Sequence, residues 1–329
     1  MKLIVLFIVT CAIVMDSVGQ QNPQYSQYMH NTYLLNPAIS GTSNGIDAVI
    51  GGRSQWSGLE GAPQTAFISL HTPIAKKLKL RYNPAIRISN PPKGIEKRKD
   101  FGIKHAIGGQ LLVDQYGAFT RQNASFSYAM HLPLSQKLKF SVGLRAGMSN
   151  NVFDQSKAQV LNIIDNSLNY NDPTYNSYIS NNLNKFIFDF GAGLYVYTEN
   201  LFLGLNADNL TRDLLKFGVG NVNFNTQMHY NAIFGFNFRA RDFTITPSVL
   251  IKKMQPTPFS IDASVMMNYK GKFWFGPSYR HGDAVIGIIG ISIKNKFRIG
   301  YSYDYSISRF NAVSSGGHEI MLGLKFGSK

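Results

Sequence analysis

Apolar and polar residues alternate strictly along much of this chain. Between residues 137 and 149 every second side chain is apolar, and the residues between them are small or charged. The apolar set is Phe140, Val142, Leu144, Ala146 and Met148, and the opposite set is Ser141, Gly143, Arg145 and Gly147. A period of two is typical of a β-strand with one apolar and one polar face. If the apolar face meets lipid, an added arginine should harm assembly at Leu144 and be better tolerated at Ser141.

The same alternation predicts about fourteen strands, most of them about ten residues long, which is the length a tilted strand needs to cross a bilayer. They begin near residues 45, 63, 102, 119, 137, 186, 200, 228, 242, 258, 272, 283, 296 and 317. The faces opposite the apolar ones carry charged side chains, including Arg145, Asp189, Asp262, Arg298 and Asp304. We therefore predict an all-β fold, a transmembrane antiparallel outer-membrane β-barrel. A soluble lipocalin-like or double-sheet protein is the alternative.

The predicted connections alternate between short and long. Tight turns are expected at residues 197–200, 240–241, 270–271 and 295, and long polar connections at 150–185, 209–227 and 305–316. Outer-membrane barrels place short turns in the periplasm and longer loops outside the cell. An even number of strands would put both ends of the barrel sequence on the periplasmic side, where the tight turns are expected.

Residues 1–19 have the layout of a secretory signal peptide. Lys2 supplies a positive start, an apolar run follows, and small residues precede the expected cleavage after Gly19. Cys11 is the single cysteine of the sequence. Lipid attachment there is the less favoured alternative, because Thr10 rather than a smaller residue precedes it. Removal of the signal would leave a chain without disulfides or thiolate metal sites.

The predicted domain organisation has three parts. The signal peptide occupies residues 1–19, and residues 45–329 form the barrel. The intervening segment, residues 20–44, precedes the first strand. It is expected either to line the periplasmic mouth or to fold into the lumen as a plug, and the sequence leaves both alternatives open.

Composition adds a basic rim to this picture. Charged residues make up 16% of the chain, against about 25% in a typical soluble domain, yet the formal net charge is +15. The connection at residues 72–101 holds nine Lys or Arg residues and two acids, and Lys97, Arg98 and Lys99 are consecutive in it. This periplasmic basic rim is either a solvated surface or an electrostatic dock for an acidic periplasmic partner.

No motif in the chain supports catalysis or a cofactor. Residues 41–45 fit the G-x-S-x-G string of serine hydrolases, but a strand rather than a helix is expected after it, so we interpret it as a turn. The seven histidines are scattered without a metal-binding pair. The basic charge lies in turns and not in an aromatic groove, which argues against nucleic acid. The sequence therefore predicts no catalytic residues, no metal site and no cofactor.

Two stretches near the start of the predicted mature chain resemble the PorP/SprF family of the Bacteroidota type IX secretion and gliding machinery. They are residues 21–43, which read QNPQYSQYMHNTYLLNPAISGTS, and residues 53–73, which read RSQWSGLEGAPQTAFISLHTP. Residues 301–326 are similar to the family's final hairpin. Asn22, His30 and the long basic connection depart from the family pattern.

The resemblance implies an outer-membrane barrel that is not an enzyme. Family members bind a secreted adhesin or other cargo through its C-terminal sorting domain, and support its export or surface anchoring during type IX secretion or gliding motility. It also implies periplasmic or lipoprotein components of the machinery as partners, besides outer-membrane lipid. The alternative function is a porin or a hydrophobic-solute transport channel.

The candidate partner-binding residues lie in two predicted extracellular segments. The first is the hairpin between the first two strands, with Arg53, Gln55 and Trp56. Trp56 suits either an aromatic belt at the membrane interface or a binding hot spot. The second is the 150–185 loop, which supplies tyrosines with apolar area and a polar tip. They are Tyr170, Tyr175 and Tyr178.

Overall fold

The computed structural model describes residues 23–74, 102–157, 185–211, 216–217, 227–254 and 257–327. Several predictions lie outside the described residues. They are the signal peptide, residues 75–101 of the basic connection with Lys97, Arg98 and Lys99, and the loop tyrosines Tyr170, Tyr175 and Tyr178.

The described residues form a β-barrel with fourteen wall strands. These are β1 (Ile46–Ser54), β2 (Gln64–Pro73), β3 (Lys104–Tyr116), β4 (Phe119–Pro133), β5 (Lys139–Phe153), β6 (Lys185–Tyr197), β7 (Leu201–Asp208), β9 (His229–Phe236), β11 (Phe243–Met254), β12 (Ser260–Tyr269), β13 (Phe273–Arg280), β14 (Ala284–Ile293), β15 (Phe297–Ser306) and β16 (Gly317–Phe326). Two short elements complete the sheet. β10 (Phe238–Ala240) continues β9 along β11, and β8 (Lys216–Phe217) pairs with the start of β6.

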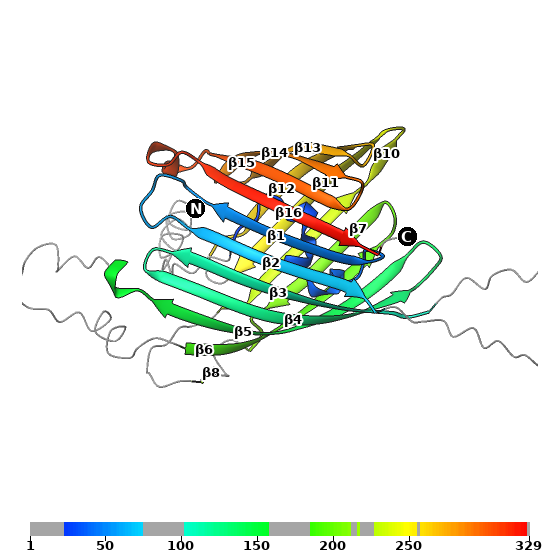
Figure 1. Cartoon of the computed structure of the whole chain (residues 1–329), viewed down its shortest axis with the longest axis horizontal. Helices are drawn as coiled ribbons and strands as arrows, with labels where there is room; N and C mark the ends of the chain where they lie inside the picture. The colour runs from blue at the N-terminus through cyan, green and yellow to red at the C-terminus, as the bar shows by residue number, and fades with distance from the viewer. Residues whose placement is uncertain are drawn as a thin grey trace, which may run out of the picture.

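Every wall strand pairs antiparallel with its neighbours, and the ring is closed. β1 pairs with both β2 and β16, and β9 pairs with both β7 and β11. Closure satisfies the backbone groups that a sheet edge would leave unpaired in lipid. Figure 1 shows the strands tilted across the long axis of the barrel. The prediction of an antiparallel transmembrane barrel with about fourteen strands is confirmed.

The burial pattern follows the alternation in the sequence. On β5, Leu144 is 60% exposed, whereas Ser141 on the opposite face is 0% exposed. The same inversion holds on other strands, since Ile289, Ile320 and Phe126 are exposed and face outward. Large apolar side chains on the outside are favourable only where lipid covers them. Among the described residues, no helix has the length and apolar character needed to cross a membrane.

The two ends of the barrel differ in their turns. β1 begins and β16 ends at one end, which we call the terminal end, and the tight turns after β4, β6, β12 and β14 lie there as well. Lys270, Lys294 and Asn295 adopt positive φ in these turns, as tight hairpins require. The other end, called the distal end, carries the hairpin at residues 55–63 and the connection at residues 307–316 (Figure 1). By the usual orientation of such barrels, the terminal end faces the periplasm.

Candidate functional site

Residues 23–41 lie inside the barrel, and we call this segment the plug. It consists of three short 3-10 turns, η1 (Tyr28–His30), η2 (Thr32–Leu34) and η3 (Pro37–Ile39). Asn36 begins the third turn, because its side chain accepts the N–H of Ala38 and proline follows at the first helical position. Tyr28 is 1% exposed and Ala38 is fully buried. In Figure 1 these turns appear in dark blue, within the ring of strands.

Side chains of the plug bond to the inward face of the wall around the whole ring. The Tyr28 hydroxyl lies 3.1 Å from that of Ser248 and 3.0 Å from that of Ser264. On the other side of the lumen, the Tyr33 and Ser127 hydroxyls are 2.8 Å apart. Further bonds join Asn31 to Ser69, Asn36 to the carbonyls of Leu194 and Leu205, and Ser141 to the carbonyl of Ala38. The plug is therefore attached to both halves of the barrel.

Inward-facing glycines make room for the plug. A Cβ atom added to Gly143 would collide with the backbone of Ala38, and one added to Gly193 would collide with the Asn36 side chain. The glycines on the inner face therefore accommodate polypeptide and do not widen an empty lumen. Their place on β5 and β6 explains why the plug approaches those strands closely.

A buried charge cluster, called the distal cluster, holds the first turn of the plug near the distal end. Arg53 donates to Asp304 at 2.8 Å and lies 3.6 Å from Glu319, and all three side chains are at most 5% exposed. The backbone N–H groups of Ser26 and Gln27 donate to the two oxygens of Glu319 at 2.7 and 3.0 Å. The Ser26 hydroxyl donates to Asp304 and accepts from Arg53. Both carboxylates therefore bind the plug and the wall together.

The distal cluster extends along the wall to β11, β12 and β13. Arg280 donates to Asp304 at 3.1 Å and to Asp262 at 3.0 Å, and Lys252 lies 3.0 Å from Asp262. With Arg53 and Glu319, the cluster pairs three cations with three carboxylates, and Arg280 also lies 3.5 Å from a fourth carboxylate, Asp283. Burial of ions is costly unless each is paired and hydrogen-bonded. The pairing therefore accounts for how these charges are tolerated inside the barrel.

All three stretches that carry the family resemblance meet in this cluster. Ser26 and Gln27 come from residues 21–43, Arg53 from residues 53–73, and Asp304 and Glu319 from residues 301–326. These motif residues are joined by direct hydrogen bonds and ion pairs. The motifs thus describe one three-dimensional arrangement, in which the plug is fixed to the first and last strands of the wall.

Trp56 lies above the cluster in the hairpin between β1 and β2. Its φ is 53°, a left-handed conformation that is rare for a bulky residue and costs about 1–3 kcal/mol. The ring stacks on Phe310 with centroids 4.2 Å apart and planes 21° apart. Two 2.7 Å backbone bonds hold the neighbouring Ser57 to Ser315 and Gly316. The surrounding loop therefore fixes a partly exposed aromatic side chain at the distal end.

An open cavity of about 480 Å³ lies beside Trp56 at the distal end, and we call it the mouth pocket. Its lining includes Gln24, Trp56, Lys253, Phe259, His281 and Phe310. Arg280 and Lys252 also line it and belong to the distal cluster, so the cluster forms part of its base. The mouth pocket combines apolar rings with hydrogen-bonding groups, which is typical of a site for a peptide or a small ligand.

The structure separates the three hairpin residues singled out from the sequence. Arg53 and Gln55 are 4% and 6% exposed and face the interior, while Trp56 lines the mouth pocket. The sequence offered no motif for Arg280, Asp262 or Lys252. Their only signal was their position, as charged residues on the inward face of predicted strands. Within the described ranges, no group of three or more His, Cys, Asp or Glu residues is placed to hold a metal ion.

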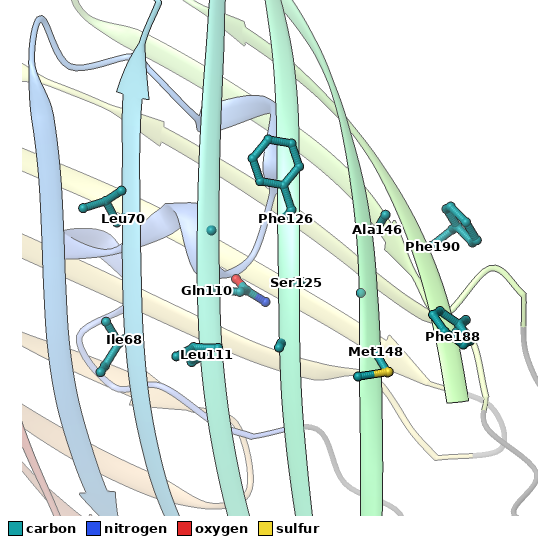
Figure 2. Close-up of a pocket in the computed structure, with 13 residues that line it drawn as sticks. Ile68, Leu70, Gln110, Leu111, Ser125, Phe126, Ala146, Met148, Phe188 and Phe190 are labelled. Carbon is teal, nitrogen blue, oxygen red and sulfur yellow. The ribbon is translucent and has the colours of Figure 1, made fainter. Parts of the chain in front are cut away.

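A second concavity lies on the outward face of the wall and has a different character. It has a volume of about 650 Å³ and spans β2 to β6 (Figure 2). Large apolar side chains surround it, among them Leu70, Leu111, Phe126, Met148 and Phe190, and small residues such as Ala124 and Ala146 form its floor. It brings no charged side chains together, and its position on the apolar face makes it part of the lipid-facing surface.

Comparisons with known proteins agree with the architecture. The family model for "Type IX secretion system membrane protein PorP/SprF" matches residues 17–324. No curated protein matches the chain.

Similar solved structures include a mutant of the monoaromatic hydrocarbon channel TodX, which is 10% identical, with 90% of this chain and 94% of that chain covered and a TM-score of 0.49. The monoaromatic hydrocarbon channel CymD is 12% identical, with coverage of 94% and 95% and a TM-score of 0.47. Omp33 from Acinetobacter baumannii is 8% identical, with coverage of 87% and 100% and a TM-score of 0.44. Likenesses this distant carry no inference about function.

Proposed function

The chain belongs to the PorP/SprF family of type IX secretion system membrane proteins and is an outer-membrane β-barrel, and on that premise we propose that its distal mouth binds one secreted protein. The partner is a cargo or adhesin with a type IX C-terminal sorting domain. The barrel supports its export or its anchoring at the cell surface and catalyses no reaction. Where the machinery drives gliding motility, the partner is the adhesin that moves.

The observation that carries this proposal is the conformation of Trp56. A bulky residue with positive φ is strained, and such strain persists only where the surrounding structure holds it. Here the surrounding contacts keep an indole ring beside the mouth pocket, stacked on Phe310. Tryptophan is among the residues most enriched at binding hot spots. Arg53 contributes from below, because it ties the end of β1 to the distal cluster, and the Gln55 N–H donates to the Pro63 carbonyl across the hairpin.

The plug argues against an open porin, one form of the alternative function. A porin needs a continuous path through the lumen. The plug is bonded to the wall on opposite sides of the barrel, at Ser127 and at Ser264, and to the distal cluster between them. These contacts favour a binding protein over an open channel.

A second contact is proposed at the terminal end. The tight turns there expose a set of basic side chains, namely Lys137, Lys139, Arg239, Arg241, Lys270, Lys272, Lys294 and Lys296. They add to the basic connection at residues 72–101, whose Lys97, Arg98 and Lys99 lie outside the described residues. We expect an acidic periplasmic or lipoprotein component of the machinery to dock at this rim through long-range attraction.

Replacement of the hairpin tryptophan tests the proposal. Trp56→Ala should reduce the surface retention of one specific secreted protein at least several-fold, because it removes the aromatic anchor of the mouth pocket. Barrel abundance should stay normal. The measurement is quantitative surface proteomics of mutant and wild-type cells, with Phe297→Ala, an exposed aromatic of the terminal end, as the matched control.

A different result would support the transport channel. If no secreted protein changes in Trp56→Ala cells while uptake of a small solute does, the partner-binding function fails and the transport channel takes its place.

A further inference from the structure

The plug crosses the lumen in a definite direction. Its last residues lie near the terminal end, where the Ser40 carbonyl lies 2.7 Å from His131 Nε2 and the Gly41 N–H donates to His71 at 3.0 Å. His131 and His71 stand near the terminal ends of β4 and β2. Going backward along the chain, the plug rises through the lumen until Ser26 reaches the distal cluster. The segment before the first strand therefore runs from the distal end to the terminal end.

The first described residues continue to the distal mouth. Pro23 lines a small internal cavity of about 70 Å³, which shares His229 and Asn231 with the mouth pocket. Gln24 lines the mouth pocket, together with Trp56. The side-chain oxygen Oε1 of Gln24 is buried and has no hydrogen-bond partner in the protein. A buried acceptor without a partner costs about 1–3 kcal/mol, so a donor in the pocket would favour rotation of the Gln24 amide toward the pocket.

Contacts at the seam between the first and last strands hold the plug in this direction. Glu319 accepts two N–H groups from the plug, and Asp304 accepts the Ser26 hydroxyl. Both carboxylates belong to β15 and β16, the last strands made, whereas Arg53 belongs to β1. The cluster therefore joins the plug to both sides of the seam at which β16 pairs with β1. Reversal of the plug inside the closed ring would break the hydrogen bonds of Ser26 and Gln27 to Asp304 and Glu319.

We propose that the N-terminal end of the plug is displayed at the cell surface, where Gln24 forms part of the floor of the mouth pocket. From Pro23 at the extracellular mouth, the described chain thus passes through its own lumen to the periplasmic end, before it builds the wall. A protein segment that enters the pocket would place an apolar side chain against Trp56 and donate an N–H or O–H group to the Gln24 amide oxygen, once that amide turns toward the pocket. This contact rests on the proposed function, whereas the display of Gln24 does not depend on it.

Cysteine labelling in intact cells tests the display. Gln24→Cys should react with a membrane-impermeant biotin maleimide in intact cells, as should Asn311→Cys, which is exposed in the distal connection. Gln136→Cys is the matched control, because it replaces the same residue type in an exposed terminal turn. It should react only after the outer membrane is permeabilised. Wild-type cells, with the single Cys11, give the background.

Reaction of Gln24→Cys only after permeabilisation, or only after denaturation, would overturn the display. A second measurement guards against a variant that does not assemble. A short epitope inserted directly before Pro23 should be detected by antibody on intact cells, and detection only in permeabilised cells would also overturn it. If Gln24 proves not to be displayed, the predicted effect of Trp56→Ala on the secreted partner still stands. The display of Gln24 and the binding of a secreted partner can therefore be disproved independently.

Discussion

The inner and outer faces of the barrel wall have opposite chemistry, although the same strands build both. On the outer face, Leu144 and Ile289 are each 60% exposed and would be covered by lipid. On the inner face, Ser141 is fully buried and Ser127 is 1% exposed, and both hydroxyls are hydrogen-bonded to the plug. The inner face thus behaves as a polar core packed against the plug, and not as the lining of a water-filled pore. The comparison shows that polar side chains are buried on the inner face where they find hydrogen-bond or ionic partners. On the outer face, apolar side chains are exposed because lipid covers them.

The largest effect is expected where the polar core loses a charge. Asp304 binds Arg53, Arg280 and the Ser26 hydroxyl, so Asp304→Ala leaves buried guanidinium groups without a full set of anions. The loss should destabilise the barrel by about 3–5 kcal/mol. The measurement is the urea midpoint for unfolding of the barrel in lipid vesicles.

An exposed ion pair supplies the control for this prediction. Asp154 pairs with Lys157, and both side chains are at least 43% exposed. Asp154→Ala should leave the urea midpoint close to that of the wild type, because exposed ion pairs contribute little to stability. Equal midpoints for Asp304→Ala and Asp154→Ala would show that the buried charges are not essential to the fold.

The next effect concerns arginine on either face of β5. Leu144→Arg places a charge against lipid and should cost about 2–4 kcal/mol. The sequence predicted better tolerance at Ser141, but the structure opposes that expectation, because its buried hydroxyl donates to the Ala38 carbonyl at 2.7 Å. Ser141→Arg should therefore also impair assembly, through collision with the plug. Outer-membrane abundance of the heat-modifiable barrel measures both.

Deletion of residues 23–41, the plug, distinguishes the two causes of impaired assembly, which are a charge against lipid and a collision with the plug. Without the plug, the inner face opens to water, so the deletion should restore assembly of Ser141→Arg and leave Leu144→Arg impaired. A deletion that rescues both variants, or neither, would contradict the distinction between the two faces.

The smallest effect on stability is expected from displacement of the plug alone. Gly143→Val would push a side chain into the backbone of Ala38, and overpacking of this kind costs about 1–3 kcal/mol. Ion conductance in planar bilayers gives the sharper signal: the wild type should stay closed and Gly143→Val should conduct. Gly287→Val is the control, because Gly287 has no neighbour within 4 Å of an added Cβ. Large, steady conductance by the wild type would favour the channel function.

The wall was predictable because its signal is local. Each strand repeats a two-residue alternation, and every predicted start lies within two residues of the observed one. The outward phase of Leu144 and the inward phase of Arg145 follow from that alternation and from the physics of a bilayer. The turns were predictable for the same reason, since residues such as Gly271 and Asn295 tolerate positive φ.

The plug and the distal cluster were decided only by tertiary structure. The sequence left residues 20–44 open between a mouth lining and a plug, because short 3-10 turns have no periodic signal. Ser26 and Asp304 are 278 positions apart, and Arg53 and Asp304 are 251 apart. Arg53 therefore looked like a surface anchor until its partners were in place. Pairing of buried charges across such distances depends on closure of the ring, which no local pattern encodes.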